Sequence, residues 1–180
     1  MPRYFNTAGP CRADLHYMLP PERRVGGLHT LIDQELYFIL HAPRQVGKTT
    51  SLLALAERLT AEGRYTALLT TCEVGQKLVP DLEGSMAAIL SLLQQQARIR
   101  LPEPLQPPAT DASQPPESRL NDLLERWAQR SPRPVVLFLD EIDALQDDVL
   151  ISVLRSCAPA YPLVPTTFPQ LHRARRLRDV

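Results

Sequence analysis

The chain has 180 residues, a formal net charge of zero and a hydrophobic share of 44%, which together indicate one globular domain. A net charge of zero excludes a whole-protein field that would draw the chain to nucleic acid or to a membrane. No apolar run approaches the roughly 20 residues that span a bilayer, and three widely spaced cysteines without metal-binding spacing predict reduced thiols in a cytoplasmic protein.

The first half of the chain reads as helices and strands in alternation. Residues 1–27 have no hydrophobic period and are interpreted as an irregular arm, and residues 28–34 are predicted to form a short helix. Residues 36–40 form a short apolar run that predicts a buried strand. Leucine and alanine then recur at helical spacing over residues 49–62, so we predict a helix there, closed by Gly63.

The pattern continues with β-branched and apolar residues at 65–71, which predict a second strand, and with a helix over residues 81–98. Residues 102–117 contain six prolines, so we expect an exposed linker there that is extended or disordered, mobile and not needed for ligand binding.

A short amphipathic helix is predicted from Leu120 to Trp127, then a third strand over residues 135–139 and a helix over 147–155. The alternation predicts an α/β fold in which a parallel sheet is covered by helices on both faces.

The residues that connect the first predicted strand to the following helix fit the phosphate-binding pattern G-x-x-x-x-G-K-[ST], with Ala in place of the first Gly. A loop at a helix N-terminus offers unpaired N–H groups and the positive end of the helix dipole to an anion. The sequence therefore predicts a site for nucleotide phosphates at Ala42, Pro43, Arg44, Gln45, Val46, Gly47, Lys48, Thr49 and Thr50.

Three of these residues receive individual roles. Gly47 lets the backbone approach the phosphates closely, and Lys48 places its ammonium group on the β- and γ-phosphates, where it counts as catalytic. Thr49 offers its hydroxyl to magnesium.

The third predicted strand ends in two carboxylates, Asp140 and Glu141. A carboxylate at the end of a buried strand is costly unless something pairs with it, and magnesium is a natural partner. We predict that Asp140 holds the ion through its water shell and that Glu141 orients and deprotonates the attacking water. The alternative is an apolar strand that simply continues into an acidic surface turn.

Residues 42–50 and 138–143 resemble the AAA-type branch of P-loop ATPases, and residues 3–10 and 16–21 resemble the start of bacterial AAA-like ATP-binding proteins. The resemblance implies ATP and Mg²⁺ as ligands and leaves room for a homo-oligomer. It also implies the strand order fifth, first, fourth, third, second. In that order residues 65–71 form an outer strand, and the strands 36–40 and 135–139 flank the fourth strand.

The chain departs from this pattern after Arg155, where no clear apolar strand follows. Three prolines interrupt residues 156–165, and residues 170–180 are rich in arginine. We therefore expect residues 28–180 to form a partial ATPase core whose C-terminal strands are missing or disturbed. One hypothesis is an exposed basic tail. Such a tail could contact nucleic acid, but no other feature of the sequence indicates a nucleic-acid partner. The other is a shifted reading frame, since codons allowed for residues 171–176 also encode Ser-Ile-Val-Leu-Val followed by the start of Gly.

Three functions fit these observations. The leading hypothesis is a Mg-dependent ATPase that acts as a switch or motor on an unknown protein partner. The second is a nucleotide-binding module that does not hydrolyse, or a nonfunctional truncated fragment of such an ATPase. The third is a small-molecule kinase, because the phosphate loop is shared. ATP is preferred over GTP by resemblance, since the chain has no Asn-Lys-x-Asp guanine signature.

Overall fold

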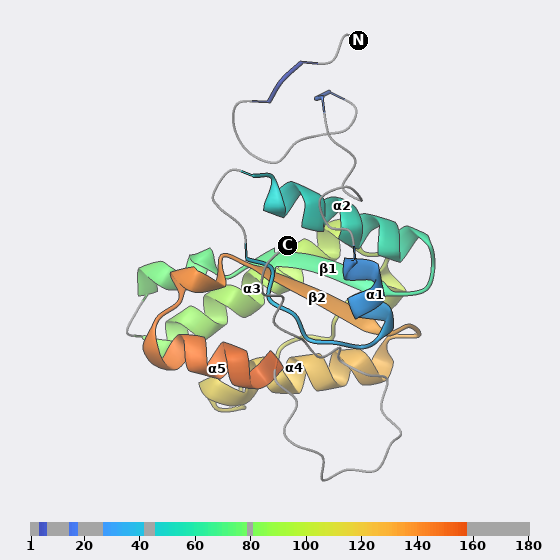
Figure 1. The fold of residues 1–180 in the computed structure, drawn as a ribbon. Coiled ribbons are helices and arrows are strands. Elements are labelled where there is room, and N and C mark those ends of the chain that lie inside the picture. The colour runs from blue at the N-terminus through green and yellow to red at the C-terminus, as the bar shows by residue number, and fades with distance from the viewer. Residues whose placement is uncertain (1–3, 7–14, 18–26, 42–45, 79–80, 158–180) are drawn as a thin grey trace.

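The fold is centred on two strands, β1 (Thr66–Thr71) and β2 (Val135–Asp140) (Figure 1). They pair in parallel, with Thr66 opposite Val135 and Thr71 opposite Asp140. The ranges agree with the second and third predicted strands, and their pairing agrees with the neighbours that the resemblance implies. The computed structural model describes five segments of the chain: residues 4–6, 15–17, 27–41, 46–78 and 81–157.

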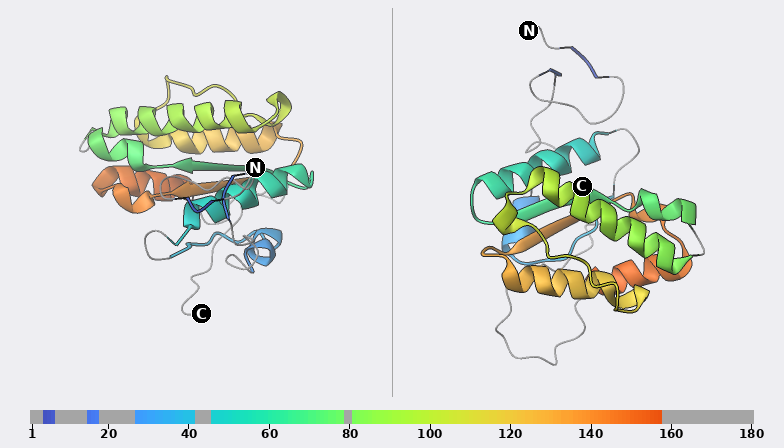
Figure 2. Two further views of the ribbon diagram at one scale, coloured as in Figure 1. Left: turned by 90° about the horizontal axis from the view of Figure 1, so that it is seen from above. Right: turned by 180° about the vertical axis from the view of Figure 1, so that it is seen from behind.

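Helices lie on both faces of this strand pair, as the sequence predicts (Figure 2). α2 packs against both strands, with α1 on the same side of the sheet, and α3 packs on β1 from the opposite side beside α4 and α5. Short 3₁₀ turns follow β1, α3 and β2 at Glu73–Leu78, Glu103–Leu105 and Ile142–Ala144. The helices are α1 (Leu28–Asp33), α2 (Lys48–Ala61), α3 (Leu82–Arg100), α4 (Pro116–Arg130) and α5 (Asp147–Cys157).

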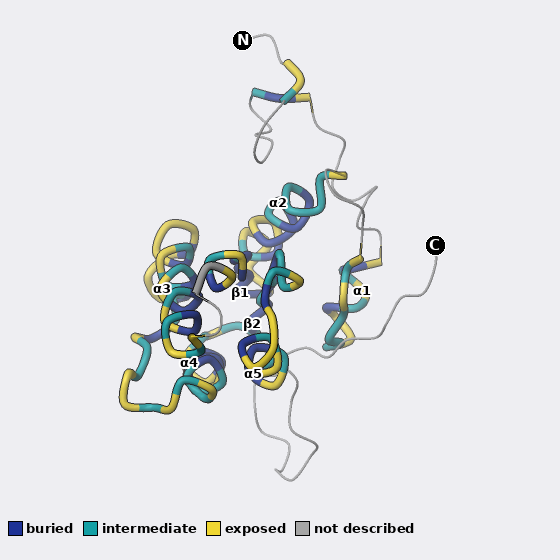
Figure 3. The backbone as a smooth tube through the Cα atoms, turned by 90° about the vertical axis from the view of Figure 1, so that its left-hand side faces the viewer, coloured by how far each residue is buried: buried dark blue, intermediate teal, exposed yellow. Residues whose placement is uncertain are grey.

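Alternation along the strands divides the core into two hydrophobic clusters. Ala67 and Leu69 of β1 pack with α1 and α2, whereas Leu68 between them packs with α3 and α4. This is the period of two that sends successive strand side chains to opposite faces. The helices turn their buried sides toward the sheet and their exposed sides outward (Figure 3). Helices therefore shield both faces of the sheet from water, and the ends of the strands lie between these two helical layers.

Glycines mark both ends of α2. Gly47 precedes the helix with φ 83° and Gly63 follows it with φ 79°, a left-handed conformation that glycine adopts without steric cost. The position of Gly63 after the last turn confirms the predicted helix end. The helix thus starts directly after Gly47, which places Lys48 and Thr49 in its first turn.

The predicted strand over residues 36–40 is not part of the described sheet, although Leu36 and Ile39 each take part in an isolated β-bridge. The described sheet contains only β1 and β2, and residues 36–40 run between α1 and His41 as an extended segment with single bridges in place of a continuous ladder. Its side chains are half-buried, except Ile39, which is 54% exposed. An apolar run becomes a regular strand only when a neighbouring strand satisfies its backbone groups, and no described strand lies next to this run.

The proline-rich segment 102–117 is only partly the exposed linker that was predicted, because Leu105 and Pro108 within it are buried. Leu105 is buried, and its carbonyl oxygen accepts a hydrogen bond from the indole nitrogen of Trp127 at 2.9 Å. The side-chain amide of Gln94 donates to the Pro108 carbonyl at 3.2 Å and to the Thr110 hydroxyl at 2.9 Å. Proline has no backbone N–H to donate, so side chains of α3 and α4 supply hydrogen-bond donors to this segment.

The last proline of this segment starts a helix instead of preventing one. Pro116 is the first residue of α4, where the missing N–H is no loss and the fixed φ favours the helix. As a result α4 begins four residues before Leu120, the start of the predicted apolar face.

Only two short pieces of the N-terminal arm, residues 4–6 and 15–17, are described, and a parallel bridge joins Tyr4 to His16. The predicted basic tail, residues 170–180, lies outside the described residues. Among the helices that are described, none is long and apolar enough to cross a membrane.

Gln94→Ala should lower the free energy of unfolding by about 1–2 kcal/mol, because it removes two hydrogen bonds that hold the proline-rich segment on α3. Urea unfolding measures the change, and limited proteolysis should cut residues 106–115 faster in the variant. Gln95→Ala is the matched control: Gln95 is the exposed next residue of the same helix, and its substitution should change stability by under about 0.5 kcal/mol. Equal effects of both substitutions would contradict the tethering role of Gln94.

Candidate functional site

The C-terminal end of β2 meets the N-terminal end of α2, and polar side chains from both elements gather there. Asp140 is the last residue of β2, and Lys48 and Thr49 are the first two residues of α2. The Lys48 Nζ atom lies 3.6 Å from Asp140 Oδ1, and the Thr49 hydroxyl donates a hydrogen bond to Asp140 Oδ2. The structure therefore joins residues that are 91 positions apart in the sequence, as the motif analysis predicts.

Asp140 is only 4% exposed, so its negative charge needs partners inside the protein. Besides Lys48 and Thr49, the backbone N–H of Glu141 donates to Asp140 Oδ1 at 3.1 Å. Lys48 is 25% exposed in its side chain and reaches the carboxylate from the solvent side. One buried carboxylate thus receives a cation, a hydroxyl and an amide, and all three approach it from the edge of the sheet.

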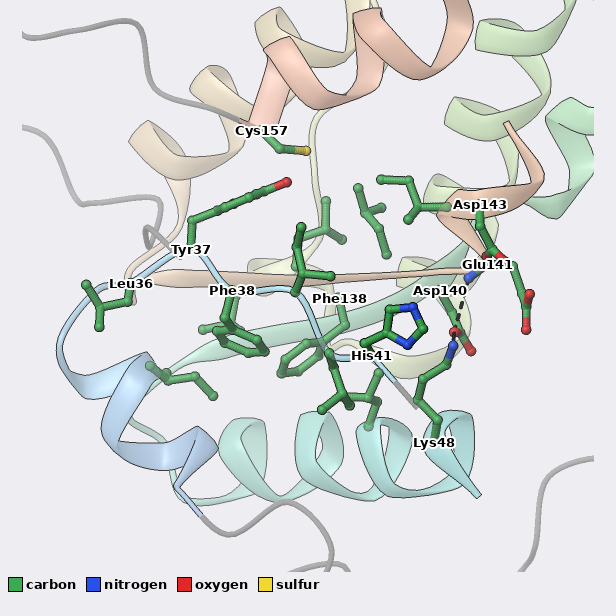
Figure 4. Close-up of a pocket in the computed structure, with 18 of the residues that line it drawn as sticks. Leu36, Tyr37, Phe38, His41, Lys48, Phe138, Asp140, Glu141, Asp143 and Cys157 are labelled. Atoms are coloured by element: carbon green, nitrogen blue, oxygen red, sulfur yellow. Dashed lines mark hydrogen bonds and ion pairs between the residues drawn. The ribbon is translucent and has the colours of Figure 1, made fainter. Parts of the chain in front are cut away.

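Glu141 has a backbone conformation that is unusual for a residue with a side chain. Its φ is 53° and its ψ is 39°, in the left-handed region that costs a non-glycine residue about 1–3 kcal/mol. The turn breaks the alternation of β2, so Glu141 leaves the strand beside Asp140 instead of continuing into the core (Figure 4). Such strain is concentrated at functional sites, which makes Glu141 a candidate reacting group.

The N-terminus of α2 has the features of an anion site. Its N-cap residue, Gly47, has no side chain that could cap the helix, and its first turn contains no acidic residue. The helix is 14 residues long, so its dipole places partial positive charge at this end. Of the predicted phosphate loop, Val46, Gly47, Lys48, Thr49 and Thr50 are described, whereas Ala42, Pro43, Arg44 and Gln45 lie outside the described residues.

A cavity of about 320 Å³ opens beside this site, between β2 and residues 36–41 (Figure 4). Lys48, Asp140 and Glu141 lie at one end of it, and Tyr37 and Cys157 line it further along. Burial raises the pKa of the Cys157 thiol to about 11, and burial together with the nearby thiol raises the pKa of the Tyr37 hydroxyl.

Sequence reasoning missed this cavity and did not single out Tyr37, His41 or Cys157. No motif announces them, because they face the cavity only through the spacing between β2 and residues 36–41. The one signal in the sequence was indirect, namely the lack of a further apolar strand after Arg155.

The donor set at the end of β2 suits a hard divalent cation. A carboxylate and a hydroxyl are oxygen ligands of the kind that Mg²⁺ prefers, and Mg²⁺ usually keeps several waters and binds through one or two protein groups. No cluster of three or more His, Cys, Asp or Glu side chains that could hold a metal occurs among the described residues. An ion here would therefore take its other ligands from water and from a bound phosphate.

Comparison with known proteins places this site in a family. The sequence profile of the AAA ATPase domain matches residues 23–160, which is more than half of the chain and includes both motifs. No curated protein matches the chain, and no solved structure matches it either. The chain belongs to the AAA ATPase domain family, and membership of this family supports nucleotide binding.

Asp140→Asn should lower the free energy of unfolding by about 1–3 kcal/mol in the absence of nucleotide, because the buried group loses its charge-assisted bonds. Chemical denaturation measures it. Asp143→Asn serves as the control, since Asp143 is exposed in the same loop and its change should stay within about 0.5 kcal/mol. An unchanged stability in Asp140→Asn would show that the carboxylate gains nothing from its three donors.

Proposed function

We propose that this domain binds ATP with Mg²⁺ at the junction of β2 and α2 and hydrolyses it, acting as a switch or motor on a protein partner. The observation that carries the proposal is the convergence of Lys48 and Thr49 on the buried Asp140. An ion pair that only stabilised the fold would have no reason to lie at a helix N-terminus. Here it lies at the dipole end of an uncapped helix, where a polyphosphate is stabilised.

Lys48 supplies the charge for the phosphates. Its ammonium group is tied to Asp140 at 3.6 Å and is partly exposed, so a phosphate oxygen can reach it from solvent without opening the core. The N-terminal turn of α2 adds backbone donors to the same point. When a phosphate binds, it takes the place of Asp140 as the anionic partner of Lys48. The ammonium group is therefore never buried without a negative charge beside it.

Thr49 and Asp140 would hold the magnesium ion. Both already share one hydrogen bond, so their oxygen atoms lie on the same side of the site. When bound, Mg²⁺ neutralises charge on the phosphate oxygens. Asp140 keeps its backbone bond to the Glu141 N–H in either state, which fixes the direction of the carboxylate.

Glu141 is the proposed base for hydrolysis. Its left-handed backbone turns it out of the strand next to the carboxylate that would hold the metal, and its side chain is only partly buried. A carboxylate in this position can orient a water molecule and accept its proton.

A nucleotide-binding module without hydrolysis is the second candidate. It is favoured by the described sheet, which has two strands and an open cavity beside the proposed base. Positioning matters strongly for the rate, because a displacement of about 1 Å can cost two orders of magnitude. Binding and turnover are therefore measured separately.

Lys48→Ala should weaken ATP binding at least about tenfold, because it removes the cation that meets the phosphates. Isothermal titration calorimetry with MgATP measures this, and EDTA should weaken binding to the native protein. Arg130→Ala, which also removes one positive charge but from an exposed position at the far end of α4, should leave the affinity unchanged. Equal affinities of the native protein and Lys48→Ala would remove the assignment.

Glu141→Gln should keep ATP binding and lower phosphate release at least about 100-fold, because the amide cannot accept the proton of water. Phosphate release is followed without any acceptor, which separates hydrolysis from kinase activity. The matched control Asp143→Asn should retain the native rate. A native protein that binds MgATP yet releases no phosphate would establish the module without hydrolysis.

A further inference from the structure

The three partners of the Asp140 carboxylate hold it in different ways (Figure 4). The Thr49 hydroxyl donates to Oδ2, and the backbone N–H of Glu141 donates to Oδ1 at 3.1 Å. The Lys48 ammonium lies 3.6 Å from Oδ1, which is longer than the roughly 2.8 Å of a typical charge-assisted hydrogen bond. The two neutral donors therefore fix the orientation of the carboxylate, and Lys48 acts mainly by neutralising its charge.

Lys48 can leave this arrangement without breaking the other two bonds. Its ammonium group sits on a flexible four-carbon stem, and its side chain is 25% exposed. Asp140 is 4% exposed and is held at the end of β2, so it cannot follow. When Lys48 turns to another anion, Asp140 keeps two hydrogen bonds but loses the positive charge that neutralised it. A second cation beside the carboxylate then becomes favourable.

The other described carboxylates nearby offer a divalent ion little alternative. Glu141 is partly exposed and Asp143 is exposed, both in the turn after β2. Among the residues that the structure describes, no three His, Cys, Asp or Glu side chains cluster closely enough to hold a metal. Asp140 is thus the main anchor for an ion at this point. Two cations at one partly buried carboxylate repel each other with little screening by salt, so Lys48 and a metal ion compete for it.

We propose that Lys48 competes with the divalent ion for Asp140 and thereby makes metal binding depend on nucleotide. While Lys48 neutralises Asp140, the carboxylate has little affinity for a second cation. The phosphates of a nucleotide attract Lys48, and Asp140 regains its full charge beside the Thr49 hydroxyl. Nucleotide and metal then strengthen each other's binding, and linkage makes this coupling reciprocal. The inference rests on the proposed function, because that function assigns Lys48 to the phosphates and Asp140 to the metal.

Competition gives Lys48 two effects of opposite sign. Removing its charge should weaken nucleotide binding, because the phosphates lose a cation. The same change should strengthen the binding of metal alone, because Asp140 is no longer neutralised. A lysine that only stabilised the fold, or that only bound phosphate, would produce no gain in metal affinity.

A metal titration without nucleotide tests the competition directly. The probe is Mn²⁺, which shares oxygen ligands and octahedral geometry with Mg²⁺ and whose free concentration is measured by electron paramagnetic resonance. Lys48→Met removes the charge and keeps an apolar stem, so the full chain with this change should bind Mn²⁺ at least about tenfold more tightly than the native chain. Adding Asp140→Asn to Lys48→Met should abolish the gain.

Two further variants control for net charge and for folding. Arg130→Met removes one positive charge from an exposed position at the end of α4 and should leave the Mn²⁺ affinity within about twofold of native. Lys48→Met leaves a buried carboxylate without a cation, which can unfold the chain. Lys48→Gln is therefore measured as well, since its amide is neutral yet can still donate to Asp140. It should show the same gain, and circular dichroism verifies that each variant is folded.

The native chain supplies a readout that needs no substitution. ADP retains the β-phosphate that Lys48 is proposed to meet and has no γ-phosphate to lose. Saturating ADP should raise the Mn²⁺ affinity of the native chain at least about tenfold. The complex should also bind Mn²⁺ more tightly than ADP does in buffer, because Asp140 and Thr49 add oxygen atoms to those of the nucleotide.

Three results would overturn the proposal: native Mn²⁺ affinity in both Lys48→Met and Lys48→Gln, a gain that survives Asp140→Asn, or an Mn²⁺ affinity of the native chain that ADP does not change although ADP binds. A native chain that binds no nucleotide would instead refute the proposed function. The titrations without nucleotide would still decide whether Lys48 competes with the metal for Asp140.

Discussion

The buried carboxylate of Asp140 is the interaction on which the rest of the site depends. It lies where the sheet ends and α2 begins, and its partners come from both elements. Without Lys48 and Thr49 the charge would be desolvated and unpaired, a cost of several kcal/mol. The same bonds hold the start of α2 against the end of β2, so the orientation of the anion-binding helix end is set by the group proposed to hold its metal ion.

Much of this arrangement could be predicted from the sequence because its causes are local or follow from the layout of a parallel sheet. The apolar runs at 65–71 and 135–139 form strands because each satisfies the backbone hydrogen bonds of the other. Glycines mark both ends of α2. The start of α2 and the carboxylates at the end of β2 meet because α2 packs along both strands and begins at the carboxyl edge of the sheet. The proximity of Lys48 and Asp140 needed no knowledge of the intervening chain.

The features that escaped prediction depend on partners distant in sequence. Residues 36–40 carry strand propensity, but a strand is defined by what pairs with it, and the neighbour it needs is not among the described strands. The sequence of residues 102–117 gives no sign that Gln94 will donate a hydrogen bond to the Pro108 carbonyl or Trp127 to the Leu105 carbonyl. The cavity between β2 and residues 36–41 likewise depends on how far apart these two segments lie, which cannot be read from the sequence.

The closure of the β1 edge by Thr60 limits how this domain can associate with itself. A sheet with two open edges can add copies without end and grow into a fibre. Here the Thr60 hydroxyl interrupts the outer edge of β1 at Ala67, so the described part of that edge offers no continuous row of free backbone groups. A single threonine thus makes the outer edge of β1 a poor template for a strand from another molecule.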